Sequence, residues 1–165
     1  MYLLEAVIVL ELRKARSGRT DAGLTAWAGS VAPQDMFLSA LSLLELESGA
    51  ARLERTDKAA GTALRAWLDA QVARAFDGRI LPVDAAVVRR CGQLAYDDTR
   101  NGLLAATALE HGLVLVTRSP AAFKSGRVKT FNPWGYTPDA SEEDADWRKA
   151  ARAGPLWLKN LFIRT

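Results

Sequence analysis

The sequence predicts an α/β protein, a three-layer α/β/α sandwich in which a mostly parallel sheet lies between helices. The first reason is an alternation along the chain: short apolar runs rich in β-branched residues are followed by segments whose apolar residues fall at helical spacing. The second is composition. The 165 residues are 49% apolar and 25% charged, which is typical of a globular domain and unlike a disordered or collagen-like chain.

The first strand is expected in the apolar run Tyr2 to Leu10, which Glu5 interrupts and which continues into a helix. A short helix is expected around Leu24 and Trp27, and Pro33 marks the turn that follows. The charged Glu5 is the anomaly of this segment, because a buried strand rarely contains an isolated carboxylate.

A second short strand is expected at residues 37–42, and a long helical region follows it. Gly49 and Gly61 allow breaks in that region, so at least two helices are expected. Six apolar residues fall at helical spacing and predict one buried stripe. They are Leu64, Trp67, Leu68, Val72, Ala75 and Phe76.

A third strand is expected at residues 80–83, and Asp84 is placed to cap the helix after it. Residues 103–109 are apolar nearly all round, which predicts a helix buried between layers. Gly112 ends that helix, and residues 113–117 form a short apolar strand.

The last part of the chain differs from the rest. We expect one domain over residues 1–134 and an extension over residues 135–165, which holds an acidic patch and then a short apolar stripe. The stripe must dock on the domain, on a second copy of the chain or on a partner. It consists of Trp157, Leu158, Leu161 and Phe162.

Charge and cysteine content set broad limits on function. The 22 basic and 19 acidic residues give a net charge of +3, which tolerates a polyanionic partner. The single cysteine, Cys91, cannot form an internal disulfide, so a cytoplasmic location is expected. The N-terminal apolar run lacks the features of a secretory signal and is too short to span a bilayer, so no membrane association is expected.

Polar groups follow the predicted strands where a parallel sheet places functional sites, at its carboxyl edge. Glu5 lies on the first strand, Glu45 follows the second, and a polar cluster at residues 97–101 opens the buried helix. A buried carboxylate must be paired, protonated or bound to a cation. Converging oxygen ligands suit a hard divalent ion such as magnesium or manganese.

Four segments make the sequence resemble PIN-domain toxins of the VapC and FitB type. In order they are MYLLEAVIVLELRK, LSLLELESG, RNGLLAATALEHGLVLVTRS and FNPW, and the resemblance covers residues 1 to about 134. It implies a PIN-like fold and a metal-dependent endoribonuclease that hydrolyses RNA phosphodiesters. It also implies the toxin of a type II toxin–antitoxin system, with a cognate antitoxin, a homodimer, and operator DNA bound only through the antitoxin.

The chain departs from the family pattern at its acidic positions. Where the family's first strand ends in Asp-Thr-Asn, this sequence has Glu5, Ala6 and Val7. The family acid of the second motif is present as Glu45, whereas the acid that opens the buried helix is replaced by Asn101. Further on, two more family residues are replaced. Ser119 stands for an Asn or Asp, and Ala122 stands for a later Asp.

The resemblance implies that Glu5, Glu45 and Asn101 are the catalytic residues and hold Mg²⁺ or Mn²⁺. It leaves other interpretations open: a strand-end glutamate that reaches solvent for Glu5, a helix-surface pair for Glu45, and a helix N-cap for Asn101. Candidates to support the site or contact substrate are Ser42, Ser119, Arg118 and Asp98, although Asp98 is more typical of a capping acid.

Basic residues after the first strand could contact RNA phosphates, or form a solvated helix face. They are Arg13, Lys14 and Arg16. Two functions follow from the whole pattern. One is a ribonuclease toxin whose activity the missing acids weaken. The other is a catalytically inactive PIN module that acts by binding an antitoxin or a PIN homologue.

Overall fold

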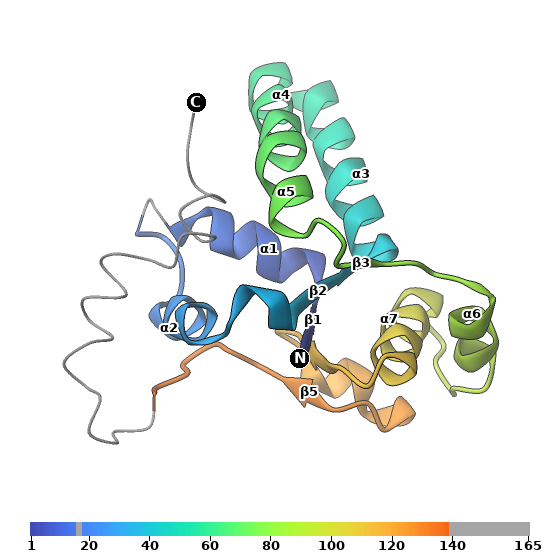
Figure 1. Ribbon diagram of the computed structural model, residues 1–165. Coiled ribbons are helices and arrows are strands. Elements are labelled where there is room, and N and C mark those ends of the chain that lie inside the picture. Colours follow the sequence, from blue (N-terminus) through green and yellow to red (C-terminus); the bar gives the residue numbers. More distant parts are fainter. Residues whose placement is uncertain (16–17, 139–165) are drawn as a thin grey trace.

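Five short strands form one parallel sheet, in the order β3-β2-β1-β4-β5, in the computed structural model, which describes residues 1–15 and 18–138 (Figure 1). The pairings of β1 with β2 and β4, of β2 with β3, and of β4 with β5 are all parallel. The strands are β1 (Tyr2–Leu4), β2 (Met36–Ser39), β3 (Ile80–Leu81), β4 (Val114–Val116) and β5 (Thr130–Phe131). The predicted parallel sheet is confirmed.

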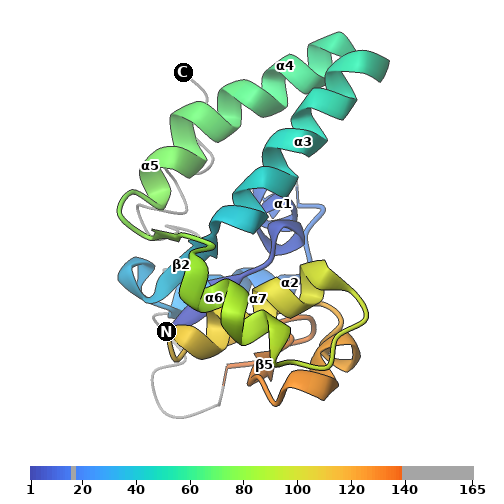
Figure 2. The same cartoon turned by 90° about the vertical axis from the view of Figure 1, so that its right-hand side faces the viewer.

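Helices cover both faces of this sheet. The α-helices are α1 (Ala6–Arg13), α2 (Ala22–Ser30), α3 (Ala40–Thr56), α4 (Lys58–Trp67), α5 (Ala73–Ala75), α6 (Ala85–Gly92) and α7 (Thr99–Glu110). Short helical turns are η2 (Pro33–Asp35), η3 (Leu68–Val72) and η4 (Pro120–Gly126). Figures 1 and 2 show α3 and α4 side by side as a hairpin that projects from the sheet.

Alternate residues of β1 divide the core into two halves. Leu4 belongs to the cluster that includes Ile8 of α1 and Leu24 of α2. Its neighbour Leu3 belongs to the other cluster, with Leu104 and Ala105 of α7. Successive side chains of a strand point to opposite faces, so the sheet lies between two helical layers. The predicted three-layer sandwich is therefore confirmed.

The first strand is much shorter than expected. It ends at Leu4, and the helix α1 begins at Ala6, so the expectation of strand over most of Tyr2 to Leu10 was wrong. The reason is that α1 is itself buried on most sides, with Ile8 and Val9 fully enclosed. A helix without a polar face shows no helical periodicity in its sequence, and it therefore resembled a continuing strand.

The second strand is also shorter, and the third has only two residues. β2 ends at Ser39, whose hydroxyl oxygen accepts a hydrogen bond from the backbone N–H of Leu41 at 3.2 Å. This bond caps α3, which therefore begins at Ala40 rather than after residue 42. The expected cap of α6 is confirmed, since Asp84 accepts from the backbone N–H groups of Ala86 and Val87.

A break at a glycine was expected in this helical region, but the break between α3 and α4 is at Asp57. The carboxylate of Asp57 accepts from the backbone N–H of Ala60 at 3.0 Å and so starts α4. Gly49 lies within α3, and Gly61 lies within α4 at the place where the two helices touch. A Cβ at Gly61 would lie 2.3 Å from the backbone nitrogen of Glu54, so this glycine permits close packing instead of a break.

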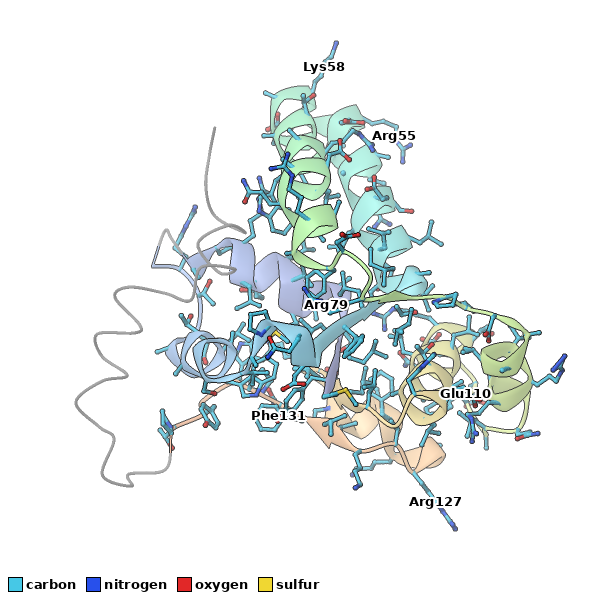
Figure 3. All side chains as sticks on the ribbon, in the orientation of Figure 1. Arg55, Lys58, Arg79, Glu110, Arg127 and Phe131 are labelled. Carbon is cyan, nitrogen blue, oxygen red and sulfur yellow. The ribbon has the colours of Figure 1, made fainter. Side chains whose placement is uncertain are left out.

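The predicted stripe along α4 to α5 faces the core: five of its six residues are buried, and Ala75 is half-buried. At the base of the hairpin the guanidinium of Arg79 donates to the backbone carbonyls of Pro33, Met36 and Ala75 (Figure 3). At the opposite end Arg55 and Lys58 project into solvent (Figure 3). The hairpin is thus anchored at its base, and its opposite end carries exposed charged side chains.

The edge strand β5 was not anticipated, because two residues carry no recognisable period. Phe131 of β5 packs against Tyr2, Trp27 and Tyr136. Beyond it, the backbone N–H of Gly135 donates to the carboxylate of Asp21 at 3.1 Å. The chain as far as Tyr136 therefore contacts α2.

The apolar stripe from Trp157 to Phe162 lies outside the described residues, and the division of the chain at residue 134 stays a prediction. Within residues 1–15 and 18–138, no helix combines the length and apolar character that crossing a bilayer requires.

Candidate active site at the carboxyl edge of the sheet

Three elements bring the predicted site residues to one edge of the sheet. Glu5 directly follows β1, Glu45 lies in the second turn of α3, which follows β2, and Asn101 lies in the first turn of α7. β1 is the central strand; the chain continues from β1 to β2 on one side, whereas it continues from the neighbouring strand β4 to β5 on the other side. In open parallel sheets, ligands bind at the carboxyl edge beside such a reversal.

A residue that sequence reasoning missed, Arg100, joins the three side chains. Its Nη1 donates to Oε1 of Glu5 at 3.1 Å and to Oδ1 of Asn101 at 3.0 Å. Its Nε donates to Oε1 of Glu45, and its Nη2 donates to Oε2 of Glu45 at 3.0 Å. One guanidinium therefore contacts all three predicted residues, and its contact with Glu45 is bidentate.

Burial makes this cluster electrostatically demanding. The side chain of Glu5 is only 7% exposed, that of Glu45 is 24% exposed and that of Arg100 is 38% exposed. The alternative in which Glu5 reaches solvent is therefore wrong, and Glu45 pairs with α7 rather than along its own helix. The hydrogen bond to Glu45 raises the pKa of Arg100 above its ordinary value, against desolvation, which lowers it, and the charge of Glu5 adds to the rise.

The N-terminus of α7 is capped by Asp98, not by Asn101. Oδ1 of Asp98 accepts from the backbone N–H groups of Arg100, at 2.8 Å, and Asn101, at 3.4 Å. The alternative of Asn101 as N-cap is therefore wrong. Asp98 is exposed, and its carboxylate is used to start the helix, which fixes the backbone that carries Arg100 and Asn101.

Ser42 links the two elements that carry the glutamates. Its buried hydroxyl donates to the backbone carbonyl of Leu4 at 3.1 Å, linking the end of β1 to α3. Leu4 directly precedes Glu5, and Ser42 lies three residues before Glu45. This bond therefore holds the two elements that carry the acids, which supports a positioning role for Ser42.

The other two predicted site residues, Arg118 and Ser119, interact with other partners. The guanidinium of Arg118 lies 5.1 Å from the centroid of the Trp134 ring. Ser119 is exposed, and its backbone N–H donates to the hydroxyl of Thr117 at 2.9 Å. In the part of the chain that the structure describes, neither residue forms a hydrogen bond or an ion pair with Glu5, Glu45 or Asn101.

Two of the predicted RNA-binding residues, Arg13 and Lys14, lie at the end of α1 and not directly after a strand. The guanidinium of Arg13 lies 5.3 Å from the centroid of the Trp67 ring, and burial lowers the pKa of Arg13. Lys14 forms an ion pair with Glu11 at 2.6 Å. Arg16 lies outside the described residues. Contact of these residues with RNA stays a prediction.

The donor chemistry of the cluster fits a hard divalent ion. Two carboxylates and the Asn101 amide oxygen converge on one positive charge, which the guanidinium of Arg100 supplies. The set is small: among residues 1–15 and 18–138, no group of three or more His, Cys, Asp or Glu residues is placed to hold a metal. A metal at this site would rely on two acids and one amide.

Comparison with known proteins agrees with this architecture. The PIN domain family matches residues 2–124. The chain is 34% identical over 143 residues to the toxin FitB of Neisseria gonorrhoeae, covering 81% of this chain and 99% of FitB. It is 28% identical over 142 residues to the VapC ribonuclease Y4jK of Sinorhizobium fredii, covering 81% of this chain and 98% of that protein.

The fold is similar to a solved structure of FitAB bound to an IR36 DNA fragment. The TM-score is 0.73 and the identity 28%, with 84% of this chain and 99% of that chain covered. The family match thus covers strands β1 to β4 and the two glutamates at the carboxyl edge of the sheet. As its four sequence segments indicated, the chain belongs to the PIN-domain family, among proteins of the FitB and VapC type.

Proposed function

We propose that this protein is a PIN-type, metal-dependent endoribonuclease and the toxin component of a type II toxin–antitoxin pair. The observation that carries the proposal is the convergence of Glu5, Glu45 and Asn101 on one cation position at the carboxyl edge of the sheet. The relatives support the same class, since FitB is a toxin and Y4jK is a VapC ribonuclease.

Glu5, Glu45 and Asn101 are the residues that would hold Mg²⁺ or Mn²⁺. When bound, such an ion polarises the phosphodiester and activates the attacking water. The chain holds its two acids in place before any ligand arrives. The backbone N–H of Glu5 donates to the carbonyl of Val116 at 3.3 Å, and Ser42 fixes α3 against β1. Rigid placement of this kind lowers the reorganisation that the reaction requires.

The same residues predict weak activity. Asn101 contributes an amide oxygen without charge, so the site holds two carboxylates, while two-metal phosphodiester cleavage generally uses more negative charge. Glu5 also carries one methylene more than the aspartate of the family, which displaces its carboxylate by roughly 1 Å, and a shift of that size can lower a rate about a hundredfold.

The proposed partners are RNA as substrate, a cognate antitoxin, and a second copy of this chain in a homodimer. Operator DNA is reached only through the antitoxin. The FitAB structure supports this assignment, because its components are bound to a DNA fragment. The single cysteine, which cannot form an internal disulfide, supports a cytoplasmic location.

A second function is favoured by one observation, the ion pairs of Arg100. A site whose acids are already paired can serve as an inactive PIN module that acts by binding an antitoxin or a PIN homologue. Restoring an acid discriminates the two functions. If Asn101→Asp creates RNA cleavage that the original chain lacks, the natural protein is an inactive module.

The direct test is cleavage of structured RNA by the purified chain with and without Mn²⁺. The ribonuclease proposal expects Mn²⁺-dependent cleavage that Glu45→Gln abolishes. The matched control is Glu47→Gln, a glutamate two residues along the same helix that pairs with Arg65 at 2.9 Å, and it should leave cleavage unchanged. RNA that stays intact in every condition would refute the enzymatic proposal.

A further inference from the structure

The side chain of Arg100 is placed to act as an internal cation for the acidic site. Four of its hydrogen bonds go to Glu5, Glu45 and Asn101, all three of the oxygen-bearing side chains proposed to hold a metal. Both carboxylate oxygens of Glu45 accept from it. A guanidinium and a hard divalent ion require the same lone pairs, so they cannot both use these oxygens at full strength.

The two glutamates need a positive charge whether or not a metal is present. Glu5 is almost fully enclosed, and two carboxylates that share one partner repel each other in a site of reduced dielectric. The two glutamates carry a formal charge of −2, and Arg100 reduces the formal charge of the cluster to −1. Without it, the pair would need another positive charge beside it.

Arg100 is also able to leave. Its side chain is 38% exposed, and its backbone is fixed independently by the Asp98 cap. Withdrawal of the side chain therefore leaves α7 intact. Arg79 is a contrasting case: its guanidinium donates to three backbone carbonyls at the base of the hairpin, so its withdrawal would break contacts that stabilise the fold.

We propose that Arg100 is a resident counter-ion that closes the Glu5–Glu45 site to divalent cations, so that a metal binds only when the Arg100 side chain withdraws. That the competing ion is Mg²⁺ or Mn²⁺ rests on the proposed function, whereas competition at these side chains can be measured without any ribonuclease activity. The consequence is a site that is stable without metal and has low intrinsic metal affinity.

A second arginine in the chain provides a matched control. Arg65 also bridges two glutamates, Glu47 and Glu54, with both contacts at 2.9 Å, and it is 37% exposed, almost the same as Arg100. It lies on the hairpin, away from the carboxyl edge of the sheet. Arg65→Gln and Arg100→Gln therefore each remove an arginine that bridges two glutamates, although the glutamates beside Arg65 are more exposed, at 37% and 30%. Only Arg100→Gln uncovers the proposed cation site.

The test measures Mn²⁺ affinity by calorimetry and the unfolding temperature with and without Mn²⁺, using the full chain. Arg100→Gln is expected to bind Mn²⁺ at least about tenfold more tightly than the original protein, as loss of a charged hydrogen-bonding competitor implies. It should unfold at a lower temperature without metal and recover when Mn²⁺ is added. Arg65→Gln should be destabilised with no such recovery.

If Arg100→Gln binds Mn²⁺ no more tightly than the original chain, the proposal is wrong. Arg100→Lys is the second variant, needed if Arg100→Gln does not fold. It keeps the positive charge, so it should bind Mn²⁺ less tightly than Arg100→Gln; an affinity that rises as much as that expected of a charge-removing variant would also overturn the proposal. The ribonuclease assay is read separately: tighter Mn²⁺ binding without RNA cleavage supports the counter-ion and refutes the enzymatic function.

Discussion

Two glycines of the helical hairpin should respond in opposite ways to the same substitution. A Cβ at Gly49 of α3 would meet no heavy atom within 4 Å, whereas a Cβ at Gly61 of α4 would lie 2.3 Å from the backbone nitrogen of Glu54. Replacing a helical glycine by alanine gains roughly 0.5–1 kcal/mol from the lower entropy of the unfolded chain. Gly49→Ala should gain this amount.

Gly61→Ala gains the same entropy but must separate two packed helices, because the close atoms belong to the backbone of Glu54 and cannot rotate away. Overpacking of this kind costs about 1–3 kcal/mol. Because the entropy gain is common to both, the two variants should differ by about 1–3 kcal/mol in unfolding free energy. Urea unfolding followed by circular dichroism measures the difference. A Gly61→Ala protein as stable as Gly49→Ala would refute the close packing of α3 on α4.

Two further predictions concern the placement of the site and of the chain end. Ser42→Ala leaves the buried carbonyl of Leu4 without its side-chain donor. It should lower the unfolding free energy by about 1–3 kcal/mol and weaken Mn²⁺ binding, which thermal unfolding and calorimetry measure on one sample. An unchanged Mn²⁺ affinity would show that Ser42 does not position the acids. Backbone hydrogen bonds from Leu24 and Gly135 lower the pKa of Asp21 below 3.8, so in the folded state it loses its proton more readily than in the unfolded state. The contribution of the Asp21 carboxylate to stability is complete above pH 3.8 and is lost as the pH falls through the lowered pKa. Acid should therefore destabilise the original chain more than it destabilises Asp21→Asn. Equal acid sensitivity of the two proteins in thermal unfolding would contradict this role.

Local sequence was sufficient for the sheet and for most helix starts, because their causes are local. Short β-branched runs identified the strand regions, and Asp84 identified a helix start three residues before its bonded partner Val87. Strand ends were less predictable. The helix α1 has so little polar surface that its residues could not be distinguished from those of a buried strand.

The site was predicted only in part, for a similar reason. The carboxyl-edge rule placed Glu5, Glu45 and the polar cluster at residues 97–101 at one edge of the sheet, since it depends on topology alone, and the family resemblance singled out Asn101 in that cluster. The position of Arg100 depends on contacts with residues 95 and 55 positions away in the sequence. The available signal was a basic residue directly before Asn101 in the first turn of a buried helix. Only the fold shows that this turn faces the two glutamates.

The most direct measurement of the competition between Arg100 and a metal is crystallographic. Crystals of the Arg100→Gln and Arg65→Gln proteins, soaked in the same Mn²⁺ solution, are compared by anomalous scattering. Competition predicts a manganese peak among Glu5, Glu45 and Asn101 that is strong in Arg100→Gln and weak or absent in Arg65→Gln. Equal peaks in the two crystals, or no peak between the two glutamates in Arg100→Gln, would contradict it.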